Sequence, residues 1–110
     1  MTTDLLSRKC QACEGGGGQV AAEEMASCLQ QVPGWESDGK MLRRTFKFRN
    51  YYEALAFVNA TAWISHRENH HPDLELGYNK VTLRYATHAV GGLTQNDFIC
   101  AAKVNALLSI

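Results

Sequence analysis

The sequence predicts an α+β fold of two layers, in which three helices cover one face of a four-stranded antiparallel sheet. Two observations lead to this prediction. Apolar residues recur at three- and four-residue spacing in three segments, as they do on amphipathic helices. Between these segments lie short runs of strand-type residues, joined in pairs by turn residues that favour antiparallel neighbours. The predicted order is helix, strand, strand, helix, strand, strand, helix.

The first part of the domain contains a helix followed by a hairpin. Residues Val20–Val32 carry apolar side chains at helical spacing, and Pro33-Gly34 ends the helix. Two strand segments, Trp35–Ser37 and Leu42–Phe48, flank Asp38-Gly39, a pair of residues that favours a tight turn. We therefore expect these two strands to pair with each other.

The longest helix is expected from Tyr51 to about Asn69, a stretch without Gly or Pro. It is apolar on more than one side. One stripe holds Leu55, Val58, Ala62 and Ser65, and a second holds Tyr52, Ala56, Asn59, Trp63 and His66. Because a sheet covers only one side of a helix, the second stripe indicates a contact with another subunit, with deeper burial inside one chain as the alternative.

The second part of the domain repeats the pattern of two strands and a helix. Pro72 ends the long helix, Leu74–Leu76 is a short strand, and Val81–Thr87 alternates as a half-buried strand does. His88 is expected at the end of that strand, on its more polar face. After Gly91-Gly92, a third helix begins with Thr94 as the cap and Asp97 three residues on, and it carries an apolar stripe of Phe98, Ile99, Ala102 and Ala106.

With 110 residues, the chain has room for one domain and one hydrophobic core. We expect that domain to span residues 20–110, preceded by an amino-terminal tail of residues 1–19 with Cys10-x-x-Cys13 and the glycine run Gly15–Gly18. Ordering glycine backbone is entropically costly, so the run indicates a flexible hinge. The alternative, a phosphate-binding loop, lacks the Gly-Lys-Ser/Thr that should follow and an apolar strand before it.

Charge and hydropathy disfavour two classes of partner. Lys and Arg total 11 and Asp and Glu total 11, so no excess of positive charge is available for direct nucleic-acid binding or for an anionic membrane. The start of the chain has only a two-residue apolar step, Leu5-Leu6, which is too short for a signal peptide or a membrane span. We therefore expect a cytoplasmic protein with free thiols. Cys10-x-x-Cys13 is half of a zinc site, with no matching second pair of ligands.

All four histidines, His66, His70, His71 and His88, lie within about a fifth of the chain. Imidazole has an unperturbed pKa of about 6.5, so it both gives and takes protons near neutral pH. Pro72 fixes its own φ and keeps His71 out of helical conformation, which makes His70-His71-Pro72 a stiff corner. We expect the two adjacent imidazoles and that of His88 to meet at one pocket.

Simpler interpretations exist for individual members of this set. His66 at a helix terminus complements the helix dipole, and His88 is also consistent with a solvent-facing strand residue. The position of Asp97 relative to Thr94 is explained by helix capping alone. Three imidazoles can hold zinc, but adjacent His-His is poor chelate spacing, so we predict no metal.

Several short motifs resemble the signature of the pterin-4a-carbinolamine dehydratase family. In chain order these motifs are His70-His71-Pro72, Tyr78-Asn79-Lys80-Val81, Thr87-His88, Gly92-Leu93-Thr94 and Asp97. Upstream, the resemblance continues through Pro33-Gly34-Trp35 and Phe46-x-Phe48-x-Asn50-Tyr51-x-x-Ala54-x-x-Phe57. It covers roughly residues 20–108, and some bacterial members carry a similar cysteine pair in the preceding tail.

The resemblance implies an α+β homodimer or homotetramer that works with no metal and no organic cofactor. The implied reaction converts 4a-hydroxytetrahydropterin to quinonoid dihydropterin by loss of water, which recycles the pterin of aromatic amino-acid hydroxylases and makes such a hydroxylase a candidate partner. One imidazolium would protonate the departing hydroxyl while a second imidazole accepts the N5 proton. The implied catalytic residues are His70, His71, His88 and Asp97. The implied substrate-binding residues are Asn69, His70, His71, Pro72, Ala86, Thr87, His88 and Ala89.

The resemblance also carries an alternative function and two departures. Animal members act in addition as non-catalytic partners that stabilise a transcription factor or a hydroxylase, so an oligomerisation role is the second hypothesis. Many relatives carry an acidic residue where this chain has His66, and an aromatic residue where it has Leu74. The first change alters the charge near the histidine pair and the second removes a ring that stacks on a pterin.

Overall fold

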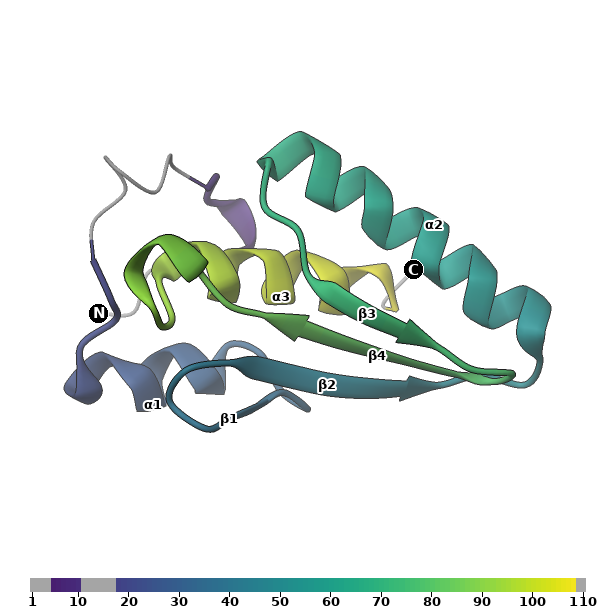
Figure 1. Ribbon diagram of the computed structural model, residues 1–110, viewed down its shortest axis with the longest axis horizontal. Helices are drawn as coiled ribbons and strands as arrows, with labels where there is room; N and C mark the ends of the chain where they lie inside the picture. Colours follow the sequence, from purple (N-terminus) through teal and green to yellow (C-terminus); the bar gives the residue numbers. More distant parts are fainter. Residues whose placement is uncertain (1–4, 11–17, 109–110) are drawn as a thin grey trace.

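The computed structural model describes residues 5–10 and 18–108 of the chain (Figure 1). Within these residues, the elements in chain order are η1 (Leu5–Ser7), α1 (Ala22–Gln30), β1 (Glu36–Ser37), β2 (Leu42–Lys47), α2 (Tyr51–Glu68), β3 (Asp73–Leu76), β4 (Lys80–Tyr85), η2 (His88–Val90) and α3 (Gln95–Leu107). Here η denotes a short 3-10 helix. The order of helices and strands confirms the predicted α+β fold.

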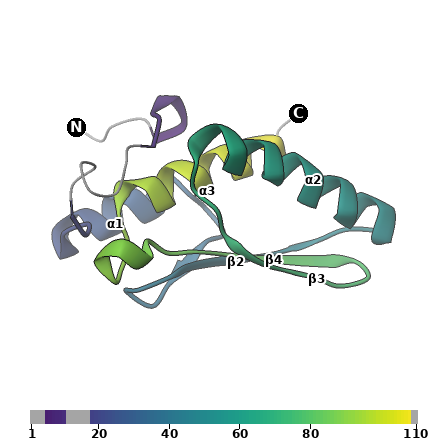
Figure 2. The same ribbon diagram turned by 45° about the horizontal axis from the view of Figure 1, so that its top comes forward.

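The four described strands form one antiparallel sheet in the order β1-β2-β4-β3. The three α-helices lie on one face of it (Figure 2). Along β4, Val81, Leu83 and Tyr85 are fully buried toward the helices, whereas Thr82 and Arg84 between them are only half-buried. One face of the sheet therefore belongs to the core and the other is left open, because side chains alternate along a strand.

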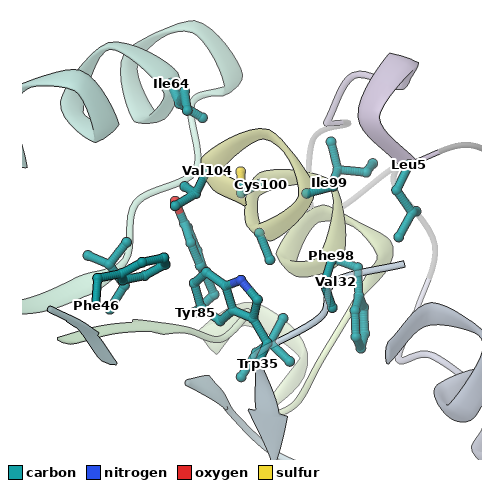
Figure 3. Close-up of a cluster of buried hydrophobic side chains, with 14 of the residues drawn as sticks. Leu5, Val32, Trp35, Phe46, Ile64, Tyr85, Phe98, Ile99, Cys100 and Val104 are labelled. Atoms are coloured by element: carbon teal, nitrogen blue, oxygen red, sulfur yellow. The ribbon is translucent and has the colours of Figure 1, made fainter. Parts of the chain in front are cut away.

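The core is built around the rings of Trp35 and Tyr85, between the sheet and α3 (Figure 3). Trp35 packs edge-on against Phe46 with ring centroids 5.9 Å apart, and its Nε1 donates a 2.8 Å hydrogen bond to Asn105 Oδ1 on α3. The Asp38-Gly39 turn joins β1 to β2 as predicted, with Gly39 at a φ of 94°. These contacts fix the strands that carry the candidate site.

The first apolar stripe predicted on the long helix is largely misplaced. The buried side of α2 consists of Ala54, Phe57, Thr61, Ile64, Ser65 and Glu68. Of the first predicted stripe only Ser65 is buried, and Val58 is half-buried against the core. The second stripe is exposed, with Tyr52 at 80% and Trp63 at 61% of their full accessibility. Apolar residues occur all around this helix, and the pattern alone therefore does not fix which side packs on the sheet.

Residues 5–10 pack against the domain. Leu5 is buried in the core, and the backbone N–H of Cys10 donates to Glu68 Oε1 at 2.8 Å. Cys13 and most of the predicted hinge lie outside the described residues, and the domain boundary at residue 20 stays a prediction. Over the described ranges, no helix has both the length and the apolar character needed to cross a membrane.

Glu68 fastens this segment through a buried carboxylate. Its Oε2 lies 3.4 Å from Lys103 Nζ and 3.7 Å from Lys9 Nζ. Burial alone would raise the pKa of Glu68, but the Cys10 N–H together with the two ammonium groups outweighs burial and lowers it. A lowered folded-state pKa adds stability above the unfolded-state pKa of about 4.3, and this stability is lost as the pH falls through the folded-state value.

We expect Glu68→Gln to lower the free energy of unfolding at pH 7 by about 1.5–3 kcal/mol, the usual range for a hydrogen bond to a charged group. The difference from the parent protein should shrink as the pH drops below about 4, where the parent carboxylate also becomes protonated. Urea unfolding at a series of pH values measures both effects. Glu53→Gln, which removes an exposed ion pair with Arg49, is the control and should have little effect. A Glu68→Gln difference independent of pH would contradict this role.

Candidate active site

In the corner that follows α2, residues 69–72, the side chains of His70 and His71 point in opposite directions. Asn69 ends the helix in the left-handed region, at φ 51° and ψ 43°, and the His70 N–H donates to Ser65 O at 3.2 Å. Asn tolerates this conformation better than most residues. Pro72 then restricts His71 to extended backbone, in which successive side chains point to opposite sides. One imidazole consequently enters the core and the other faces the open side of the sheet.

His70 is the buried member of the pair. Its side chain is only 9% exposed and its ring stacks on Tyr85, with centroids 5.8 Å apart and ring planes 9° from parallel. Its Nε2 lies 2.6 Å from Asp97 Oδ1. Because an ionised carboxylate only accepts hydrogen bonds, Nε2 carries the hydrogen in this pair. The bond thus fixes both the orientation and the tautomer of the ring.

Asp97 joins three parts of the chain through one buried carboxylate. Besides His70, it accepts hydrogen bonds at Oδ2 from Thr94 N at 2.9 Å and from Thr87 Oγ1 at 2.8 Å. Thr94 is the N-cap of α3, and its hydroxyl accepts from Asn96 N at 3.2 Å. The predicted capping pair is therefore confirmed. In addition, the same carboxylate ties the helix to the histidine corner and to the segment after β4.

His88 lies in a tight turn beyond β4. The predicted strand from Val81 to Thr87 is two residues too long, because β4 ends at Tyr85 and the chain then closes a turn. Thr87 O accepts hydrogen bonds from the N–H groups of Val90 and Gly91, and Gly91 has a φ of 69°. Glycine adopts that conformation without strain, so it lets the turn fold back and pair Thr87 with Gly92. His88 is left exposed on the turn.

A cavity of about 310 Å³ opens between this turn, the corner after α2 and the β1–β2 turn. Its lining contains Lys40, Met41, His71, Asp73, Arg84, Ala86, Thr87, His88, Gly91 and Gly92. The structure therefore brings His71 and His88 to one cavity. His70 and Asp97 do not line it and lie on the buried side of the corner.

The other predicted binding residues divide in the same way. Ala86 and Thr87 line the cavity, whereas Asn69, Pro72 and Ala89 are not among its lining residues. The two positions that depart from the family pattern also lie outside it. The ring of His66 sits 6.0 Å from that of Trp63, and Leu74 is 43% exposed on β3.

Several lining residues were missed by sequence reasoning. Arg84 could have been found from the sequence, because it alternates with buried residues in the same period-two pattern as Ala86 and His88, which also line the cavity. Lys40 and Met41 gave no local signal. They reach the cavity because β2 pairs with β4 in a register that sets Leu42 opposite Tyr85.

The charges at the cavity are mixed. Arg84 forms an ion pair with Glu75 of β3, and Lys40 and Asp73 add one charge of each sign. The volume is at the lower end of the range for small-molecule sites, which is about 300–1,000 Å³. Within the described residues, no three His, Cys, Asp or Glu side chains are arranged to hold a metal ion. Two imidazoles at a small open cavity define a site suited to proton transfer on a small molecule.

Comparison with known proteins identifies the family. The model of the family described as "Pterin 4 alpha carbinolamine dehydratase" matches residues 18–107. A protein from Nitrosospira multiformis is 52% identical over 107 residues, which cover 97% of this chain and 95% of the relative, and one from Dechloromonas aromatica is 56% identical over 107 residues, covering 97% and 96%. Both carry names that assign them provisionally as pterin-4-alpha-carbinolamine dehydratases. The chain belongs to the pterin-4a-carbinolamine dehydratase family.

Two solved structures share the fold. A transcriptional coactivator/pterin dehydratase from Brucella melitensis superposes with a TM-score of 0.77 at 33% identity, covering 82% of this chain and 98% of the other. A pterin dehydratase-like protein described as a RuBisCO assembly factor in the alpha-carboxysome gives 0.56 at 27% identity, covering 66% and 84%. The family fold thus occurs in proteins whose names include roles other than dehydration.

Proposed function

We propose that this protein catalyses the dehydration of 4a-hydroxytetrahydropterin to quinonoid dihydropterin, as a step of tetrahydropterin recycling in the cytoplasm. The observation that carries the proposal is the placement of His71 and His88 at one cavity in a chain of this family. A flat bicyclic ring between two imidazoles has a proton donor and a proton acceptor within reach.

The reaction needs one group of each kind. The bond between C4a and the hydroxyl oxygen breaks as an imidazolium protonates the oxygen, and water leaves. A second, neutral imidazole takes the proton from N5, and a double bond forms between C4a and N5. We assign the more critical of the two transfers to His71, because Pro72 holds its backbone and its side chain lines the cavity. His88 performs the other transfer from its turn.

In this proposal His70 and Asp97 assist from the buried side. The 2.6 Å bond between them holds the corner from which His71 extends. Asp97 also binds Thr87, the residue directly before His88, at 2.8 Å. A single carboxylate therefore positions the backbone next to both lining histidines. Asp97 and His70 are positioning residues, whereas His71 and His88 exchange the protons.

The proposal is tested by following the absorbance decay of freshly generated 4a-hydroxytetrahydropterin. The protein at catalytic concentration should accelerate the decay above the spontaneous rate, and the acceleration should saturate with substrate. Free imidazole at twice the protein concentration, matching the two lining imidazoles, is the control for unspecific acid–base catalysis. A decay that matches buffer alone at every protein concentration would refute the activity.

A second candidate function is that of a binding partner. Tyr52 and Trp63 are highly exposed on the outer side of α2, and large exposed apolar side chains mark interaction surfaces. The names of the two solved relatives include coactivator and assembly roles. We propose that this side of α2 forms the contact of a homodimer or homotetramer, with binding of a hydroxylase or transcription factor as the alternative.

Replacing Trp63 by alanine should weaken this contact, so light scattering should show a smaller particle for Trp63→Ala than for the parent protein. An unchanged mass would exclude Trp63 from the contact.

A further inference from the structure

Two cysteines that are distant in the sequence meet at the surface of α3. Cys10 Sγ lies 3.6 Å from Cys100 Sγ, and the same Cys10 sulfur lies 3.6 Å from Asn96 O one helical turn earlier. Cys10 is half-buried, whereas Cys100 is completely buried. The proposed dehydration has no use for either thiol. From this geometry we propose that Cys10 and Cys100 are an oxidation site, which closes to a reversible disulfide when the protein meets a peroxide.

The surroundings permit the two sulfurs to close. A disulfide requires a sulfur separation of about 2.05 Å, so one side of the pair must move. Cys100 is held in α3, but Cys10 belongs to a segment without regular structure. Its backbone is retained near the helix by the bond from Cys10 N to Glu68. Cys10 therefore starts next to Cys100, and a local adjustment of this irregular segment closes the pair.

The exposure of the two thiols sets the order of events. The hydrogen bond with Cys10 and burial both raise the pKa of Cys100, with Glu68 and Asp97 as nearby carboxylates that act in the same direction. Cys100 consequently remains a protonated, shielded thiol. Cys10 is the thiol that an oxidant in solution reaches first.

The chemistry balances with hydrogen peroxide as the oxidant. Cys10 attacks one peroxide oxygen, the O–O bond breaks, and Cys10 becomes a sulfenic acid with release of one water. Cys100 then attacks the Cys10 sulfur, its proton leaves with the hydroxyl as a second water, and the S–S bond forms. Two thiols have lost two electrons and peroxide has gained them. A thiol reductant returns the pair by exchange.

The disulfide would fasten residues 5–10 to α3 one turn beyond Asp97 and close a loop of most of the chain. Long closed loops restrict the unfolded state, so the oxidised protein should unfold at a temperature on the order of 10–20 °C higher than the reduced one. The site does not depend on the dehydratase proposal, because its test needs no substrate.

The test uses the full chain, treated with hydrogen peroxide and digested without reduction. Mass spectrometry should find a linked pair of peptides that contain Cys10 and Cys100, with a mass two hydrogen atoms lower than the summed masses of the two reduced peptides. Dithiothreitol should split this pair into the two single peptides. Equilibration in glutathione buffers of graded potential then measures how readily the bond forms. The thermal shift should accompany the appearance of the linked pair of peptides.

Three variants control the assignment. Cys28→Ser removes another buried thiol and should keep both the linked pair of peptides and the thermal shift. Cys10→Ser and Cys100→Ser should lose both, and Cys10→Ser alone suffices if the buried substitution impairs folding. A bond between Cys10 and Cys13, a stable sulfinic acid at Cys10, or no reaction at Cys10 would each overturn the proposal.

Discussion

Replacing His71 by alanine should remove most of the dehydration rate above the spontaneous reaction, by a factor of about 10²–10⁴, the usual contribution of one positioned acid or base. The reason is geometric. His71 lines the cavity from a corner that Pro72 holds in extended backbone, and its removal leaves His88 without the second imidazole that the two proton transfers need. Stopped-flow absorbance of 4a-hydroxytetrahydropterin measures the loss in kcat.

Controls for the His71 prediction come from the same protein. His71 is exposed, so circular dichroism and urea unfolding of His71→Ala should match the parent. His66→Ala is the paired substitution, because His66 is also an exposed imidazole but lies against Trp63 and outside the cavity lining. It should keep the parent rate. Parent-like turnover in His71→Ala would show that the critical proton moves through another group.

Replacing Asp97 by alanine should lower the free energy of unfolding by about 3–5 kcal/mol, because buried hydrogen-bond donors that lose their acceptor cost roughly 1–3 kcal/mol each. Asp97 is fully buried and accepts hydrogen bonds from His70, Thr87 and the backbone of Thr94. Its loss leaves the ring N–H of His70 and the backbone N–H of Thr94 buried without this partner, whereas Thr87 Oγ1 keeps Thr94 Oγ1 at 2.9 Å, and it removes part of the cap of α3. Urea denaturation measures the loss.

Asp97→Asn separates support of the fold from positioning of the site. The amide keeps the size of the side chain and one acceptor oxygen, so the loss of stability should be smaller than for alanine. It lacks the second acceptor oxygen, so some loss remains. If Asp97 positions the backbone beside His71 and His88, then kcat of the folded variant should fall while KM changes little. A variant that is less stable but has parent kcat would show that the carboxylate serves the fold alone.

The fold was predictable because its signals are local. Asp38-Gly39 marks a tight turn, and Thr94 with Asp97 marks a helix start, whatever the rest of the chain does. These markers sit between segments of clear periodicity, and the element order follows. The side of α2 that packs on the sheet was not predictable in this way, since apolar residues surround the helix and only some of them, including Ala54, Phe57 and Ile64, are buried in the core.

The site was predictable in part. The cluster of histidines predicted a shared pocket, and two of its members, His71 and His88, line one cavity. His88 reaches it from the turn after β4 and not from the end of the strand. The placement of His70 in the core and His71 at the cavity was not predicted. It depends on the left-handed conformation of Asn69, which the sequence allows but which no motif indicates. The approach of Lys40 depends on pairing between distant strands, for which single residues carry no signal.

In the proposed function, one cavity holds a pterin between His71 and His88. Nitrogen-15 NMR of the histidine side chains, recorded while a non-reacting dihydropterin is titrated into the uniformly labelled protein, detects such binding at both imidazoles. We expect the ring signals of His71 and His88 to shift together with one dissociation constant, and the signal of exposed His66 to stay in place. A pterin that binds without moving the His71 or His88 signals would contradict this placement.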